Sequence, residues 1–265
     1  DSGLARVPGF EPDSDMESLV IDTISQASAA QRSGRAGRTA AGTCVRLYSK
    51  RSYERRERHT LPDVARLDLS DVALKAKSWG VADLAALDMP TPAPRRSVRQ
   101  AEERLAGWGA MDCEGNLTEL GWRMSRLSLS AELSRFVLLA EAEGCLTEAV
   151  TIASSLCVRD AFLRQVDEDV LAEQRLICDR ESDFITFLNI LQEYAQAEQQ
   201  DRWCLERGIH PQYMEGVVNV RRQLFEGLGK LGTEVSSAGH PDLINWMVAS
   251  AFKHNLCSHW RANEY

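Results

Sequence analysis

No stretch of the sequence approaches the run of about 20 apolar residues that a membrane-spanning helix needs, and its beginning carries no signal peptide. No CxxC pair occurs, and the seven cysteines are widely scattered and odd in number. They predict reduced thiols in an intracellular protein, cytoplasmic or, in a eukaryote, nuclear. An initiator methionine is also lacking, so we expect the chain to be part of a longer protein.

Metal ligands at a standard spacing are lacking as well. His254, Cys257 and His259 match no zinc pattern, and a fourth ligand is missing, so they predict a core cysteine and surface histidines. Glu181 and Asp183 are two residues apart and cannot share one helix face; they favour a helix start rather than an acid/base pair. We therefore expect no metal held by this chain.

An excess of positive charge is lacking too, because the net charge is −8, which argues against a general nucleic-acid coat. The charge is uneven, however. Between Arg32 and Arg58 nine Lys or Arg face only Glu54 and Glu57, a local charge of +7, so the remainder carries −15. A basic segment on an acidic body predicts one local anionic partner, with phosphate as the first candidate.

The first fifty residues read as part of an α/β domain. Residues 18–22 and 43–49 are rich in β-branched and aromatic side chains and predict two strands. A helix is expected between them, with Ser25 as its N-cap, and the turn-rich VPGFEPDSD precedes the first strand as the top of a hairpin.

The rest of the chain reads as mainly helical. Residues 67–80 and 97–110 predict amphipathic helices, and residues 109–121 a short hairpin, together the pattern of a winged helix. Four further helices are expected within residues 129–144, 146–158, 179–200 and 210–232, and a last one from residue 240 onward. Gly144 is a natural C′ residue and Pro211 suits a first helical turn.

The segment QRSGRAGR, Gln31–Arg38, has an unusual composition for a helix. Each interior glycine costs about 1 kcal/mol relative to Ala, yet Gly34 and Gly37 both lie in it. On a helix, Gln31, Arg35 and Arg38 fall within about 60° of one another. Guanidinium matches phosphate oxygens, and glutamine can orient a water molecule. A solvated arginine-rich face is the alternative, but such a face has no use for the glycines.

The same segment resembles motif VI, QRxGRxGR, of superfamily-2 helicases of the DEAH-box/RHA type. The surrounding ISQASAAQRSGRAGR and the later C-x-RLY follow the family pattern. Residues 61–84 resemble the family's winged-helix entry, and residues 117–145 its ratchet segment, although Leu127-Ser-Leu129 and Ala131 stand where the family commonly has proline. The resemblance covers nearly the whole chain.

The resemblance implies a mixed, mainly α fold in four parts. Residues 1–50 would be the end of the second RecA-like domain, residues 51–115 a winged helix, residues 116–235 a helical ratchet domain, and residues 236–265 the start of an OB-like domain. The P-loop and the DEAH carboxylates do not occur in this sequence, so the first RecA-like domain would be a partner and the fragment alone is expected to be inactive.

The resemblance also implies a function, an ATP-dependent RNA helicase that couples NTP hydrolysis to 3′-to-5′ translocation. Arg38 would be the arginine finger, Arg35 a second phosphate contact, and Gln31 would position the attacking water, with Gly34 admitting the nucleotide. Arg32 would bridge motifs inside its own domain. The cofactor would be ATP or another NTP with Mg²⁺, the metal being held by upstream residues. RNA, possibly DNA, and an activator protein would be the partners, with no membrane.

Several assignments stay open. The hairpin spanning residues 6–22 would lie near the strand-separation point, and Arg6, Arg55 and Arg56 are candidate nucleic-acid contacts. Most of the six tryptophans are expected to pack in the core rather than to stack on bases. A non-enzymatic winged-helix and helical nucleic-acid-binding module is the alternative function, and a remodeller that hydrolyses ATP without unwinding is a third.

Overall fold

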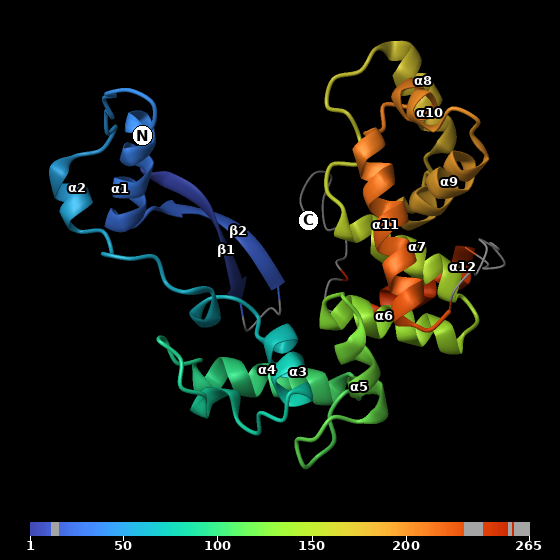
Figure 1. Ribbon diagram of the computed structural model, residues 1–265, viewed down its shortest axis with the longest axis horizontal. Helices are drawn as coiled ribbons and strands as arrows, with labels where there is room; N and C mark the ends of the chain where they lie inside the picture. Colours follow the sequence, from blue (N-terminus) through green and yellow to red (C-terminus); the bar gives the residue numbers. More distant parts are fainter. Residues whose placement is uncertain (12–15, 231–240, 254–255, 257–265) are drawn as a thin grey trace. The chain divides into compact units, whose positions relative to one another are not determined.

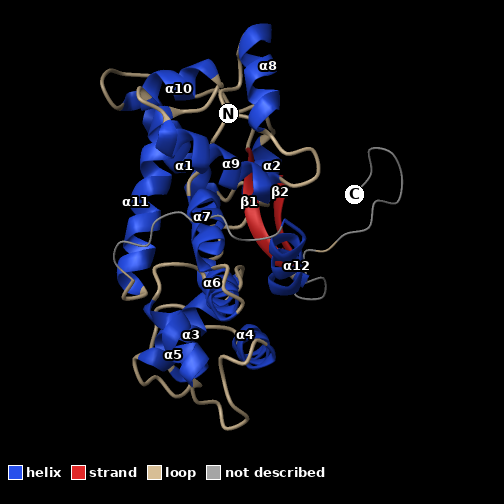
Figure 2. Ribbon diagram, turned by 90° about the vertical axis from the view of Figure 1, so that its right-hand side faces the viewer, coloured by secondary structure: helices blue, strands red, loops and turns tan. Residues whose placement is uncertain are grey.

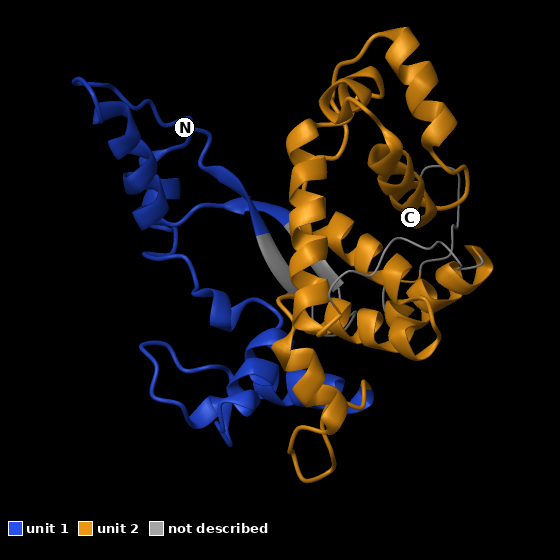
Figure 3. Cartoon of the chain, turned by 45° about the vertical axis from the view of Figure 1, so that its right-hand side comes forward, with its two compact units in different colours: residues 1–107 blue, residues 108–265 orange. Residues whose placement is uncertain are grey.

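The computed structural model describes residues 1–11, 16–230, 241–253 and 256. The chain divides into two units, Asp1–Gly107 and Trp108–Tyr265, coloured separately in Figure 3. Figure 1 labels the elements along the chain, and Figure 2 shows that helices dominate the described residues, with two strands in red. The expectation of a mainly helical chain is confirmed.

Unit 1 opens with an antiparallel hairpin of β1 (Leu4–Glu11) and β2 (Met16–Thr23). The register runs from Leu4 opposite Thr23 to Glu11 opposite Met16. The predicted strand at residues 18–22 is confirmed, but the hairpin is longer than expected because β1 continues through Pro8 and Gly9. Its base, not its tip, therefore lies closest in sequence to the arginine–glycine segment.

Helix α1 (Gln26–Gly34) follows β2 after two residues. Ser25 is its N-cap, as predicted, with the side-chain oxygen accepting a hydrogen bond from the Ser28 amide at 3.1 Å. The α-helix does not reach Arg38, however. The chain tightens into the 3₁₀ turn η1 (Arg35–Gly37), because glycine favours a helix end over a helix interior.

The strand predicted at residues 43–49 is wrong. The segment has no ladder in the described part of the chain, and only Val45 and Leu47 of it pair with Asp1 through the backbone, while the Ser49 carbonyl accepts from the Tyr53 amide at the start of α2 (Lys50–Glu54). The Asp1 ammonium donates to the Val45 carbonyl at 2.7 Å, and the Leu47 amide donates to the Asp1 carbonyl at 2.9 Å. These two hydrogen bonds, made on either side of residue 46, have the pattern of parallel strand pairing, but among the residues that the structure describes they extend over Asp1 alone. The β-branched and aromatic side chains favoured an extended backbone. A strand also needs a neighbouring extended segment whose backbone pairs with it over several residues.

The rest of unit 1 is helical. The short helix α2 (Lys50–Glu54) and the turn η2 (Asp63–Ala65) lead to α3 (Ser70–Ser78) and, after η3 (Leu84–Ala86), to α4 (Arg95–Gly107). Helices α3 and α4 pack on each other, and Ala73 and Leu74 of α3 and Leu105 of α4 are buried. The ion pair between Lys77 and Glu102, at 3.0 Å, borders this contact. Both predicted helices are present, shifted by two or three residues.

Unit 2 is built of helices around α7. Its helices are α5 (Glu119–Arg126), α6 (Ala131–Ala142), α7 (Leu146–Cys157), α8 (Glu168–Ile177), α9 (Asp183–Gln196), α10 (Gln200–Glu206), α11 (Pro211–Gly227) and α12 (Pro241–Ala251). Helix α7 contacts α6, α9 and α11 and is buried along most of its length. A bridge between Met111 and Leu117 closes the predicted hairpin that precedes α5.

Helix ends in unit 2 follow the sequence closely. Gly144 has a φ of 78°, and the Cys145 amide donates to the Ala140 carbonyl at 2.8 Å, the bond that closes a Schellman motif. Pro211 opens α11, as predicted. Sequence reasoning missed α8 and α10, which lie on either side of the helix predicted at residues 179–200.

The last helix, α12, was expected to start a separate OB-like domain. In the structure it packs on α6 inside unit 2. The Arg135 guanidinium donates to the Ala251 carbonyl at 3.2 Å, and the rings of Phe136 and Phe252 lie 5.6 Å apart between centroids. The residues that follow this contact lie largely outside the described part of the chain.

The expectation that most tryptophans pack in the core is wrong. Trp108 is buried, but Trp79, Trp246 and Trp122 are 78%, 59% and 45% exposed. Trp203 is half-buried and packs edge-on against Tyr194, at 6.0 Å between centroids. Trp260 lies outside the described residues. Helical spacing among aliphatic residues did not reveal which face of each helix the ring occupies.

Candidate nucleotide site

The arginine–glycine segment lies on the surface of unit 1. Gln31, Arg35 and Arg38 are all exposed, and in the described part of the chain none of their side chains has a hydrogen bond or ion pair. Because side chains three residues apart eclipse in a 3₁₀ turn, η1 places Arg35 and Arg38 in one column. The sequence predicted an α-helical stripe, whereas the structure places Arg35 and Arg38 at either end of a 3₁₀ turn.

The glycines of this segment meet no packing demand within the chain. A Cβ atom added at Gly34 or Gly37 would have no atom within 4 Å, and both backbones avoid the left-handed region. Gly42 differs, since its Cβ would lie 2.0 Å from the Ala36 carbonyl oxygen. Gly42 therefore lets residues 39–42 close against η1, a close approach that sequence reasoning missed.

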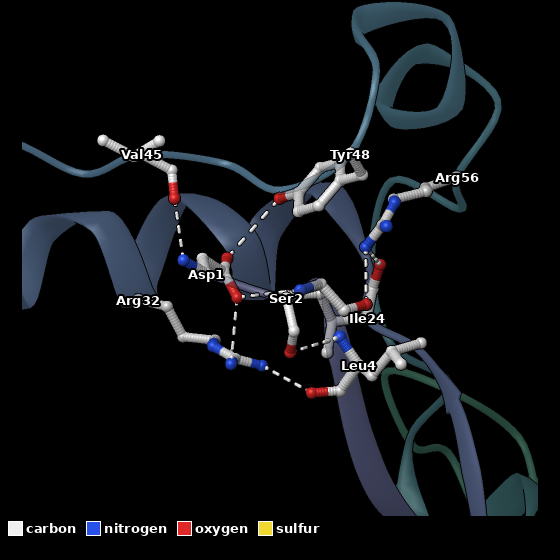
Figure 4. A network of polar contacts seen from close by, with 9 residues as sticks. Asp1, Ser2, Leu4, Ile24, Arg32, Val45, Tyr48 and Arg56 are labelled. Atoms are coloured by element: carbon white, nitrogen blue, oxygen red, sulfur yellow. Dashed lines mark hydrogen bonds and ion pairs between the residues drawn. The ribbon is translucent and has the colours of Figure 1, made fainter.

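The Arg32 side chain points toward Asp1 and Leu4 and binds inside its own unit (Figure 4). Its guanidinium forms an ion pair with Asp1 at 2.9 Å and donates to the Leu4 carbonyl at 3.0 Å. The Asp1 carboxylate is itself 5% exposed. This within-domain contact is the one expected for Arg32, and it leaves Arg35 and Arg38 as the unpaired arginines of the segment.

The three candidate nucleic-acid contacts differ from one another. Arg6 and Arg55 are exposed, and neither side chain has a partner among the described residues. Arg56 is half-buried, and its guanidinium donates to the carbonyls of Gly3 and Ile24 at 2.8 and 3.2 Å. The same group lies over the Tyr48 ring, 3.9 Å from its centroid. The structure thus gives Arg56 internal contacts that the sequence did not suggest.

Gly3 belongs to this arrangement and was also missed. Its φ is 72°, and a Cβ would lie 2.5 Å from Arg56 Nη2 and from the Tyr48 ring. Only glycine fits there without displacing both side chains. Arg56 and Gly3 are 53 residues apart, so no local spacing in the sequence could have connected them.

No metal site comes together in the described residues, because no three His, Cys, Asp or Glu side chains cluster there. His254, Cys257 and His259 lie outside the described part of the chain. Asp183 is the first residue of α9, whose N-cap is Ser182, so it stands at a helix start as the sequence predicted. Among the described residues no helix is long and apolar enough to cross a membrane.

A comparison with known protein families matches residues 130–203 to the helicase associated domain (HA2), ratchet-like. The match begins at the N-cap of α6 and ends within α10, all in unit 2. It falls inside the range expected for the ratchet domain. This similarity to a domain found in helicases supports an accessory role in a helicase.

Proposed function

We propose that this chain is the C-terminal part of an ATP-dependent RNA helicase of the DEAH-box/RHA type. The match of residues 130–203 to a helicase-associated domain carries the proposal. The motif VI segment supports it, because Arg35 and Arg38 are exposed, stand three residues apart across a 3₁₀ turn, and have no side-chain partner among the described residues. A winged helix, an OB-like start and an activator protein as partner belong to the same proposal. RNA would be held mainly through its backbone, without sequence specificity.

Arg38 and Arg35 would act on the terminal phosphate of a nucleoside triphosphate. In phosphoryl transfer, negative charge spreads over the γ-phosphate oxygens, and catalysis consists mainly of positioning and electrostatic stabilisation. A guanidinium remains charged and offers a fixed fork of donors. Gln31, one turn before Arg35, would orient the attacking water. Mg²⁺ neutralises phosphate charge when bound, and residues outside this sequence would hold it.

Arg32 cannot perform the same task while it pairs with Asp1 and Leu4. The segment would therefore divide its arginines, one anchoring the helix and two facing the nucleotide. Gly34 and Gly37, which have open space around them, would let the nucleotide approach the backbone. This division is the reason to test Arg38 first.

The test is RNA-stimulated ATP hydrolysis by the full-length protein, wild type beside Arg38→Ala. Loss of an arginine finger lowers kcat by about 10³–10⁵-fold, whereas RNA affinity should be retained. Arg95→Ala is the matched control, because Arg95 is exposed, stands at the start of α4 and has no side-chain partner among the described residues. It should hydrolyse ATP like the wild type.

Two outcomes would contradict the proposal. Equal rates of ATP hydrolysis by the wild type and Arg38→Ala would show that Arg38 is not an arginine finger. An inactive wild type that still binds RNA would favour the alternative, a non-enzymatic binding module. A strand-separation assay on the active protein then distinguishes a helicase from a remodeller that hydrolyses ATP without unwinding.

A further inference from the structure

We propose that Arg56, together with Arg32, is a positioning residue that clamps the base of the β1–β2 hairpin to helix α1. The hairpin and the phosphate-facing arginines would then move as one body. The coupled movement of the hairpin and the arginines rests on the proposed function. The clamp rests only on the contacts that Arg56 and Arg32 make in the structure. It also replaces the assignment of Arg56 as a nucleic-acid contact.

Arg56 joins the two strands where they enter and leave the hairpin. Gly3 immediately precedes β1 and Ile24 immediately follows β2, and one guanidinium nitrogen, Nη1, donates to both of their carbonyls. The Ile24 amide closes the same base by donating to the Gly3 carbonyl at 3.0 Å. Figure 4 shows the guanidinium pointing into this junction. Hydrogen bonds from a charged donor are stronger than neutral ones, so the junction is held firmly.

Helix α1 begins at the same junction. Ser25 follows Ile24 and caps the helix, so the strand end and the helix start are covalent neighbours. The amides of Gln26 and Ala27 donate to the carbonyls of Glu57 and Arg58 at 2.9 and 3.0 Å. The Gln26 side chain also donates to the Arg56 carbonyl at 2.9 Å. The first turn of α1 thus fixes the backbone that carries Arg56.

Arg32 makes the second attachment, two turns further along α1. Its donation to the Leu4 carbonyl ties the last turn of the helix to the first residue of β1. Its ion pair with Asp1 holds the residues just before the strand. Two guanidinium groups therefore connect α1 to both sides of the hairpin base, and Arg35 follows Arg32 by less than one turn.

Tyr48 fixes the orientation of Arg56. The ring lies under the guanidinium, and its hydroxyl donates to the Asp1 carboxylate at 3.5 Å. Gly3 leaves the space that this stack occupies. A guanidinium held by two carbonyls and a ring is not free to bind an RNA phosphate, in contrast to the exposed side chain of Arg55.

Hydrogen exchange tests the clamp without any assay of activity. In the full-length protein, Arg56→Ala should speed amide exchange by about tenfold or more in residues 4–7, 20–24 and 26–30, because local opening determines exchange. Arg95→Ala should leave these rates unchanged. Arg56→Lys should lie between them, since an ammonium can reach a carbonyl but lacks the planar group that stacks on Tyr48. A normal circular dichroism spectrum and melting transition would show that each variant folds.

The coupling is tested by counting base pairs separated per ATP hydrolysed. Arg56→Ala should lower this ratio by roughly tenfold to a hundredfold, the effect of a small misplacement, with RNA-free hydrolysis and RNA affinity retained. Unchanged exchange in Arg56→Ala would overturn the clamp, and faster exchange with an unchanged ratio would overturn the coupling. Weaker RNA binding with a shallower salt dependence would instead assign Arg56 to a phosphate. If the wild type does not hydrolyse ATP, the proposed function fails while the exchange result still decides the clamp.

Discussion

At the scale of single residues, Gly34 stands at a position where another residue would stabilise the helix more. Gly34 has an α-helical backbone, φ −64° and ψ −19°, and open space where a Cβ would stand. Alanine is the better helix former by about 1 kcal/mol, since it loses less backbone freedom on folding. Among the described residues no contact requires a glycine there, and under the proposed function its place would let a nucleotide approach the backbone.

Gly34→Ala should therefore stabilise the folded protein but lower its rate of ATP hydrolysis. We expect a free energy of unfolding unchanged or raised by up to about 1 kcal/mol, with ATP hydrolysis by the full-length protein lowered by roughly tenfold or more. Denaturant unfolding and steady-state kinetics measure the two effects. Gly42→Ala is the control, because its Cβ would clash with the Ala36 carbonyl and should destabilise the fold. Full activity in a stabilised Gly34→Ala would refute a role in nucleotide approach.

At the scale of elements, the sequence predicted correctly those helix ends that depend on interactions between residues close together in the chain. Ser25, Gly144 and Pro211 mark helix ends through bonds to near neighbours, and each was placed correctly. The segment 43–49 was not, because a strand requires a partner elsewhere in the chain. Helices α8 and α10 were missed as well; in the structure α8 contacts α9, and α10 contacts both α9 and α11.

Glu141 joins three elements and makes their packing depend on pH. The hydrogen bond from Lys230 is the main cause that lowers the pKa of this carboxyl below its usual 4.5; partial burial opposes the shift, and the hydrogen bond from Arg123 adds to it. Lys230 follows α11, and Arg123 belongs to α5. Because the pKa is lowered in the folded state, the stabilisation is complete above pH 4.5 and is lost as the pH falls through the lowered value.

We expect Glu141→Gln to lower the free energy of unfolding by about 1 kcal/mol at pH 7, since both basic partners are partly exposed and water screens them. The difference from wild type should vanish in acid, below the lowered pKa. Denaturant unfolding at several pH values measures it. Glu143→Gln serves as the control, because Glu143 is exposed and its side chain has no partner in the described residues. A deficit that persists in acid would assign the effect to packing rather than charge.

At the scale of the whole molecule, charge is divided between the units. Residues 1–107 contain 17 Lys and Arg against 15 Asp and Glu, a net +2, whereas residues 108–265 contain 14 against 24, a net −10. The sequence alone predicted this asymmetry and the basic segment within it. It could not predict which arginines are free, because Arg32 and Arg56 find carbonyl partners only after the chain has folded.

The salt dependence of RNA binding distinguishes arginines that bind RNA phosphates from arginines that are paired inside the fold. Each phosphate neutralised by a protein cation releases bound counterions, so the slope of log affinity against log salt concentration changes by about 0.7 per contact on single strands. Arg55→Ala should reduce the steepness of the slope by this amount and weaken binding, because its side chain is exposed and unpaired. Arg56→Ala should leave the slope unchanged, since its guanidinium already binds Gly3 and Ile24. Equal slopes for both variants and the wild type would place RNA elsewhere on the molecule, and a loss confined to Arg56→Ala would reverse the roles assigned to these two neighbours.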